Sequence, residues 1–226
     1  MKKPSRLILS ALTVAALAAT LPACAPLVVG GAAVTALSAV DRRASGAQVD
    51  DGVIEFKGAA RLRDAMGDRS NVSITSFNRQ VLLTGEVPDA ATKETAGAIA
   101  RKTIEEVVGS GHRASVVNEL TVMPASSLTQ RSNDLFITAK VKAALVDTRE
   151  LTATAFKVVT ERGSVFLMGR VTQREAALAT QVVRNVSGVN RVVRVLEEIS
   201  EDELRRLTLL PPGEKPGAKP APVTGN

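Results

Sequence analysis

Residues 165–171 read VFLMGRV, and this short apolar stretch is the clearest signal of fold in the chain. Residues 81–87 read VLLTGEV and repeat the same Val-x-Leu-x-Gly-x-Val pattern 84 positions earlier. Upstream of these stretches, residues 134–145 align without a gap with residues 51–62, where Asp, Ile, Lys, Ala and Leu coincide. Two blocks that recur in the same order at such a long spacing indicate a duplicated domain rather than a solenoid of short repeats.

Each copy predicts the same order of elements, αββαβ. A helix comes first, because apolar residues recur at spacings of three and four along 137–145. Two strands follow, joined by a tight turn in which Asn78 or Gly163 tolerates positive φ. Asp89 and Thr172 each cap a second helix, and a last strand closes the copy. The fold class is therefore α+β, with a small three-stranded mixed sheet covered by two helices in each copy. The expected strands are residues 72–77, 81–87 and 114–122, then 156–160, 165–171 and 191–199.

Short motifs in the second copy resemble the BON domain of bacterial osmotic-stress and nodulation proteins. The relevant residues are GRV at 169–171, which ends the apolar strand, and VSGV at 186–189, before the last strand. VFLMG at 165–169 and VTQREA at 171–176 are similar to the second domain of dual BON-domain outer-membrane lipoproteins of the DolP type. The resemblance covers residues 21–199. It implies two tandem BON domains and a protein on the inner, periplasmic face of the outer membrane.

The chain divides into six expected segments. We expect the two domains to fold separately, joined by a linker that makes few long-range contacts. The proline-rich end is predicted to be a disordered tail by its composition. The segments are a lipoprotein signal peptide at 1–23, a lipidated tether at 24–49, a first BON domain at 50–124, a linker at 125–131, a second BON domain at 132–199, and a short helix with the proline-rich tail at 200–226.

The N-terminus has the pattern of a secretory signal: Lys2, Lys3 and Arg6 precede an apolar run at 7–20. LPAC at 21–24 resembles a bacterial lipobox and holds the only cysteine, Cys24. The resemblance implies that the Cys24 sulfur carries diacylglycerol, that the new amine is acylated, for example with palmitate, and that the protein is sorted to the outer membrane. The alternative is an ordinary secreted protein with a cysteine near the cleavage site.

Composition and motifs argue against catalysis and against nucleic acid as a partner. The chain has no Trp or Tyr and only five Phe, whereas stacking on bases requires aromatic side chains beside positive charge. The single histidine, His112, lies in a glycine-rich loop, and adjacent carboxylates such as Asp50 and Asp51 do not converge on a metal without other ligands. We therefore predict a non-enzymatic protein without catalytic residues, a metal site or a cofactor.

The first helix of the second copy is the candidate binding site. With Ile137, Val141 and Leu145 facing the core, the outward face combines an aromatic ring, small apolar residues and two lysines. Such a face suits a helix that lies on a lipid surface, because lysine stems can follow acyl chains while the ammonium reaches phosphate. The candidate phospholipid-binding residues are Leu135, Phe136, Ala139, Lys140, Lys142 and Ala143.

Charge favours the second copy as the lipid-binding one. Residues 130–198 carry 11 Lys and Arg against 7 Asp and Glu, a net charge of +4. Residues 50–124 carry 9 against 11, a net charge of −2. The resemblance also implies binding of anionic phospholipid through the second BON domain and a role in envelope integrity. Two alternatives stay open: Phe136 packs against the first domain or the linker, or the protein is a periplasmic adaptor that binds envelope assembly proteins through its exposed apolar face.

Overall fold

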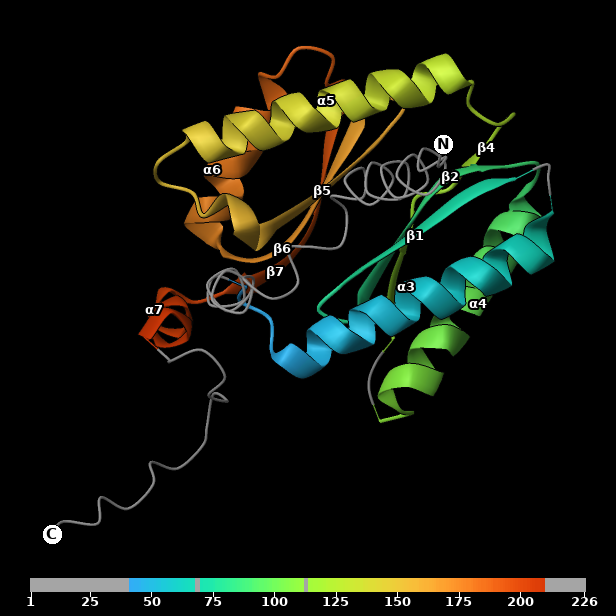
Figure 1. The fold of residues 1–226 in the computed structure, drawn as a ribbon, viewed down its shortest axis with the longest axis horizontal. Helices are drawn as coiled ribbons and strands as arrows, with labels where there is room; N and C mark the ends of the chain where they lie inside the picture. The colour runs from blue at the N-terminus through green and yellow to red at the C-terminus, as the bar shows by residue number, and fades with distance from the viewer. Residues whose placement is uncertain (1–40, 68–69, 112–113, 210–226) are drawn as a thin grey trace, which may run out of the picture. The chain divides into compact units, whose positions relative to one another are not determined.

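The computed structural model describes residues 41–67, 70–111 and 114–209. The signal and Cys24, the tether up to residue 40, His112 and the proline-rich tail lie outside the described residues. The described chain contains two αββαβ copies (Figure 1). The first copy consists of α3 (Ser45–Met66), β1 (Asn71–Phe77), β2 (Gln80–Val87), α4 (Ala90–Val108), β3 (Ser115–Asn118) and β4 (Thr121–Val122). The second consists of α5 (Leu128–Asp147), the 3-10 turn η2 (Ala153–Ala155), β5 (Phe156–Glu161), β6 (Ser164–Thr172), α6 (Gln173–Arg184) and β7 (Arg191–Ile199), followed by α7 (Glu201–Leu209).

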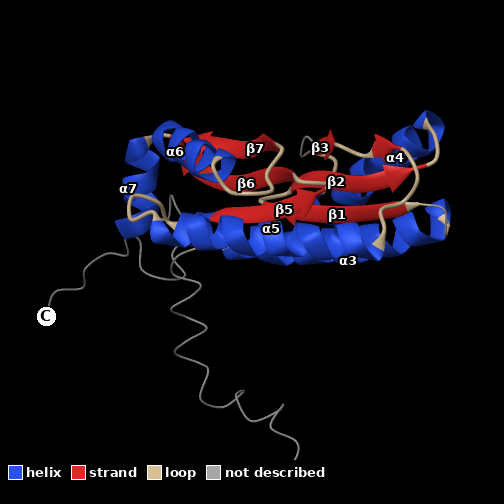
Figure 2. Ribbon diagram, turned by 90° about the horizontal axis from the view of Figure 1, so that it is seen from above, coloured by secondary structure: helices blue, strands red, loops and turns tan. Residues whose placement is uncertain are grey.

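Each copy forms its own small mixed sheet. β2 lies between β1, which it pairs in antiparallel fashion, and the parallel β3, and β6 likewise lies between β5 and β7. The α+β fold class is therefore confirmed. In the first copy the expected closing strand is broken into β3 and β4, because Leu120 turns into the core and is 2% exposed. In both copies the first helix lies along the first strand and the second helix lies toward the last strand (Figure 2).

Each copy has an aspartate at the equivalent position of its first helix, and this aspartate fastens the helix to the β-hairpin of the same copy. Asp51 accepts hydrogen bonds of 2.7 Å from the backbone N–H groups of Asn78 and Arg79. Asp134 accepts equivalent bonds of 2.8 and 2.9 Å from those of Arg162 and Gly163. These turn residues have positive φ, which leaves their N–H groups without partners in the ladder. The carboxylate satisfies them, which explains why an aspartate recurs in both copies.

A glycine at the equivalent position of each central strand allows the backbone of the preceding segment to approach closely. A Cβ atom at Gly85 would lie 1.9 Å from the carbonyl oxygen of Asn71. A Cβ atom at Gly169 would lie 2.4 Å from the carbonyl oxygen of Ala155. Both distances are far below van der Waals contact, so the Val-x-Leu-x-Gly-x-Val pattern keeps its glycine for steric reasons.

Alternate residues of the central strands serve two different cores. Val81 and Leu83 face the helices of their own copy, whereas Leu82 points to the opposite face of the sheet. That opposite face forms an apolar cluster with residues of both copies, which we call the seam. Its buried members are Phe77, Leu82, Phe166, Met168 and Val195.

Ion pairs cross between the copies as well. Arg162 Nε lies 2.6 Å from Glu86 Oε1, and Lys157 Nζ lies 2.6 Å from Glu55 Oε1. The two sheets are separate, with no strand pairing between them in the described residues. The copies nevertheless pack against each other through the seam, which is a closer association than the sequence suggested.

The helices that open the two copies begin earlier than expected. α3 begins at Ser45, so residues 45–49, expected in the tether, are helical. α5 begins at Leu128 and takes up part of the expected linker, because Ser127 and Gln130 form a capping box.

The connecting residues also make long-range contacts, contrary to expectation. Ser126 is only 5% exposed, and its hydroxyl lies 3.4 Å from the side-chain amide of Asn71. The carbonyl of Pro124 accepts a hydrogen bond of 3.0 Å from Arg162. These contacts hold the end of the first copy beside the turn of the second hairpin.

Candidate functional site

Helix α5 is held on its sheet by one face. Ile137, Val141 and Leu145 are each no more than 1% exposed and enter the core of the second copy. Asp134 is buried on the same face, where it holds the β5–β6 turn. Because this face is anchored along the length of the helix, the rest of its surface is fixed relative to the sheet.

All six candidate residues lie on the exposed surface of α5, as the helical periodicity predicted. Leu135 is 72% exposed and Phe136 is 68% exposed. The described parts of the first copy and of the connecting segment therefore do not cover the ring of Phe136. Large apolar side chains on a protein surface, when they gather on one face, are characteristic of binding sites.

The exposed apolar face is longer than the sequence analysis indicated. Leu128 is 80% exposed and Val146 is 67% exposed. Together with Leu135 and Ala139 they follow the spacing i, i+7, i+11 and i+18, which places them in one line along the helix. We call this line, with Phe136 and Ala143 beside it, the α5 stripe. Leu128 was missed because the helix was expected to start later, although the S-x-x-Q pattern at 127–130 marks its true beginning.

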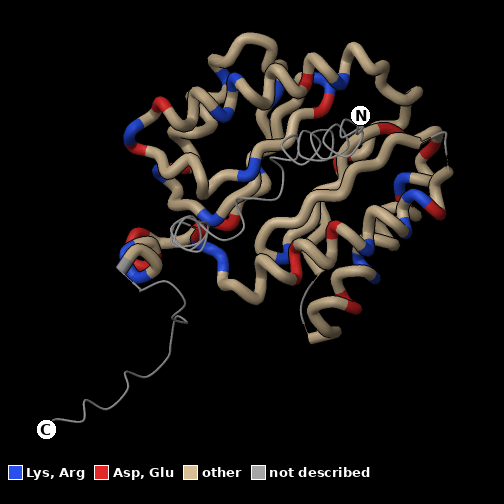
Figure 3. The backbone as a smooth tube through the Cα atoms, viewed as in Figure 1, with Lys and Arg blue, Asp and Glu red and all other residues tan. Residues whose placement is uncertain are grey.

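The two lysines of the face differ in their contacts. Lys140 Nζ donates a hydrogen bond of 3.3 Å to the carbonyl of Ser187 in the loop after α6. Lys142 is exposed and makes no hydrogen bond or ion pair within the described residues. Both signs of charge occur in both copies (Figure 3), but the second copy has the net positive charge. Lys142 is thus the freer of the two cations beside the α5 stripe.

The first copy presents a comparable apolar face on α3. Phe56 is 79% exposed and Val49 is 66% exposed. Lys57, next to Phe56, is exposed as well, whereas Val53 and Ala60 are half-buried. An exposed aromatic ring on the opening helix is therefore common to both copies, and Phe56 offers a matched comparison for Phe136.

Carboxylates beneath the start of α5 have opposite pKa shifts. Burial would raise the pKa of Glu86, but hydrogen bonds from Asn71 and Arg162 outweigh it and lower that pKa. Burial, and then the nearby charges of Glu86 and Asp134, raise the pKa of Glu161 to about 7. The charge of Glu161 therefore changes near neutral pH.

The described residues limit the chemistry that this region supports. No helix within 41–67, 70–111 and 114–209 is long and apolar enough to cross a bilayer. The same ranges hold no group of three His, Cys, Asp or Glu residues placed to bind a metal ion. The α5 stripe and Lys142 together present exposed apolar side chains beside a cation, a combination that suits non-covalent contact with an apolar, negatively charged surface.

The family model of the BON domain matches residues 50–124 and 133–198. The chain belongs to the BON-domain family. It is 39% identical, over 179 residues, to the outer membrane lipoprotein DolP of Haemophilus influenzae, an alignment that covers 78% of this chain and 89% of that protein. Two BON domains together with this similarity make the chain a dual-BON-domain protein of the DolP type. The similarity supports an outer-membrane lipoprotein with a function in the cell envelope.

A second curated protein and two solved structures were also matched. The chain is 35% identical, over 162 residues, to a protein of Actinobacillus pleuropneumoniae named 21 kDa hemolysin, covering 71% of this chain and 80% of that one. Two structures of CdsD, from the type III secretion system of Chlamydia trachomatis, align with TM-scores of 0.27 and identities of 12% and 11%. These alignments cover 71% and 66% of this chain and 68% and 96% of the CdsD chains.

Proposed function

We propose that this protein is a non-enzymatic lipoprotein, anchored through Cys24 on the periplasmic face of the outer membrane, that binds anionic phospholipid through α5 and supports envelope integrity. The observation that carries the proposal is the α5 stripe, whose Leu135 and Phe136 are about 70% exposed and lie on a helix rigidly fixed by its other face. Insertion of such side chains into the acyl boundary is favourable by about 1.5–3 kcal/mol for each large one.

Electrostatic attraction favours anionic lipid over neutral lipid. A cation near an anionic leaflet contributes about 1 kcal/mol, and Lys142 has no partner in the described residues that would compete with lipid phosphate. The acyl chains expected on Cys24 are themselves enough for stable attachment, because more than one chain is present. A weak contact through α5 would therefore select the lipid next to the protein rather than hold the protein on the membrane.

A second candidate function is that of a protein-interaction adaptor, which the exposed face of α3 favours. Phe56 and Val49 are exposed in the copy with net negative charge, which an anionic leaflet repels. A protein of the envelope assembly machinery that covers Phe56 would use the first copy and leave α5 free for lipid.

Flotation with vesicles tests the lipid proposal directly. We would use a chain that begins at residue 41, because it keeps both cores and the seam but removes the anchor and the tether. This chain should float with vesicles of phosphatidylcholine and phosphatidylglycerol but not with phosphatidylcholine alone. Flotation should fall in about 1 M salt, where the Debye length is about 3 Å. Flotation that is equal with both vesicle types, or absent with both, would contradict the proposal.

A further inference from the structure

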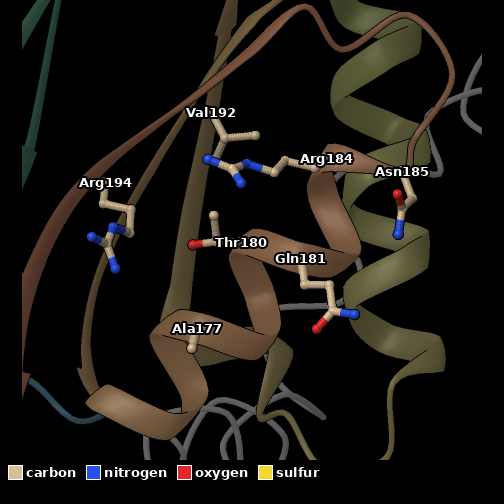
Figure 4. Close-up of a pocket in the computed structure, with 7 residues that line it drawn as sticks. All are labelled: Ala177, Thr180, Gln181, Arg184, Asn185, Val192 and Arg194. Atoms are coloured by element: carbon tan, nitrogen blue, oxygen red, sulfur yellow. The ribbon is translucent and has the colours of Figure 1, made fainter.

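A cavity of about 680 Å³ opens between α6 and β7 of the second copy (Figure 4). On α6, the lining residues 177, 180, 181 and 184 have the spacing i, i+3, i+4 and i+7, so they lie on one face of the helix. On β7, residues 192 and 194 are two positions apart, so they lie on one face of the strand. The lining includes Thr180, Gln181, Arg184 and Asn185 on the helix side, and Val192 and Arg194 on the strand. None of them belongs to the α5 stripe.

The cavity holds two arginines without partners. Arg184 and Arg194 make no hydrogen bond or ion pair within the described residues, whereas Arg162, Arg170 and Arg191 of the same copy all pair with carboxylates. The position of Arg184 in the last turn of α6 suits the helix dipole. That effect does not account for Arg194, which lies across the opening on β7.

The residues that line the cavity provide hydrogen-bond donors but no negatively charged side chain. Each guanidinium offers five N–H groups, and the side-chain amides of Gln181 and Asn185 offer further donors. The hydroxyl of Thr180 already donates to the carbonyl of Ala176 at 2.6 Å, so it is left only as an acceptor. No Asp or Glu is among the lining residues. A site rich in N–H donors and planar guanidinium groups matches the oxygens of a phosphate group.

The first copy lacks this pair of arginines. Counting from the helix caps Asp89 and Thr172, Arg101 is the counterpart of Arg184. The strand registers pair Leu82 with Val117 and Phe166 with Val193, so the counterpart of Arg194 is Asn118.

Asn118 does not replace the missing arginine. Its side-chain amide donates to the carbonyl of Lys93 at 2.9 Å and is therefore already engaged. Two arginines that line one cavity are a property of the second copy, and they are not required by the shared fold.

We propose that the α6–β7 cavity is a second binding site that takes a phosphate group, held between Arg184 and Arg194, from either a phospholipid headgroup or a soluble phosphate. This goes beyond the role proposed for α5, because it uses different elements and needs no apolar insertion. The amides of Gln181 and Asn185 complete the set of donors around the bound oxygens.

Calorimetric titration of the full chain in a non-ionic detergent with inorganic phosphate tests the site. Arg184→Gln and Arg194→Gln should each weaken binding about tenfold or more, because each removes a charge-assisted contact. Arg101→Gln, which removes the same charge at the counterpart position, should leave binding unchanged. Circular dichroism melting curves of the three variants should coincide with that of the parent chain, because these side chains are exposed.

Binding to vesicles distinguishes a phospholipid headgroup from a soluble phosphate as the source of the bound group. If inorganic phosphate does not bind, association with phosphatidylglycerol vesicles should still depend on both Arg184 and Arg194, and this would assign the site to headgroups. Phe136→Glu should leave phosphate titration unaffected, so the α5 proposal and this one can fail independently. Phosphate and vesicle binding that are no weaker in Arg184→Gln and Arg194→Gln than in Arg101→Gln would overturn the proposal.

Discussion

Arg42 holds the carboxylate of Glu175 through two hydrogen bonds of 2.7 Å, although 133 positions separate the two residues. Their side chains are only 8% and 3% exposed. Arg42 also donates to the carbonyl of Arg170, and Arg170 donates in return to the carbonyl of Arg42. Residues that precede the first copy are thus fastened to the second copy. Arg42, which precedes α3, therefore contacts the domain that carries α5.

Arg42→Ala should destabilise the protein by about 3 kcal/mol, because it leaves the buried carboxylate of Glu175 without its partner. Burial would raise the pKa of Glu175, but hydrogen bonds from Arg42 and Thr172 lower it, so this contribution is present above the ordinary pKa of 4.5 and is lost on acidification below it. The midpoint of urea unfolding at pH 7 and pH 4 measures the effect. An unchanged midpoint at pH 7 would show that the pair does not hold the segment.

Asp134→Ala should cost about 2–3 kcal/mol, because it leaves the N–H groups of Arg162 and Gly163 without their acceptor. Asp147→Ala is the matched control, since Asp147 is exposed on the same helix. Unfolding free energies of the two variants provide the comparison. Equal losses in both would mean that the carboxylate does not fasten the hairpin turn.

Glu161→Gln should stabilise the protein at pH 8 by about 1 kcal/mol and have little effect at pH 4. The pKa of Glu161 is raised to about 7 from the ordinary 4.5, first by burial. The folded state therefore holds the proton more tightly, and stability from this group is complete below pH 4.5 and is lost as pH rises through 7. Thermal unfolding between pH 4 and pH 8 should show a flatter profile for the variant. A variant that is less stable at pH 8 would refute this assignment.

Much of the fold could be predicted because it depends on local pattern and on duplication. The recurring Asp134 and Gly169 have steric and hydrogen-bonding roles that apply in each copy separately, so comparison of the copies exposed them. The outward face of α5 followed from helical periodicity alone. The seam around Phe166 and the pair of Arg42 with Glu175 could not be predicted, because nothing in a local pattern tells which distant surface a side chain meets. The arginines of α6 and β7 come together only once the strand register is known.

Cys24→Ser should leave the precursor without its lipid and release the protein from the outer membrane. The sulfur of Cys24, the only cysteine in the chain, is the one proposed attachment point for diacylglycerol. Mass spectrometry of the purified protein and fractionation of the envelope measure the two consequences. An unchanged mass and an unchanged fraction after this substitution would rule out lipidation at Cys24.

In the proposed mode of binding, α5 of the second copy meets the lipid and the similar face of α3 does not. Phe136→Glu and Phe56→Glu change similarly exposed aromatic residues on the opening helices of the two copies, since Phe136 is 68% exposed and Phe56 is 79% exposed. Neither ring enters a core, so both variants should fold, which their melting curves check.

The decisive measurement is the partition coefficient of the chain from residue 41 on phosphatidylglycerol vesicles, with each of these substitutions. Phe136→Glu should lower it by about tenfold or more, because burial of a Phe side chain is worth about 1.5–3 kcal/mol and the new charge is repelled. Phe56→Glu should leave it within about twofold of the parent value, a change of only about 0.4 kcal/mol, since α3 is not proposed to touch lipid. Equal losses in the two variants, or a partition coefficient that Phe136→Glu does not change, would show that α5 is not the lipid-binding face.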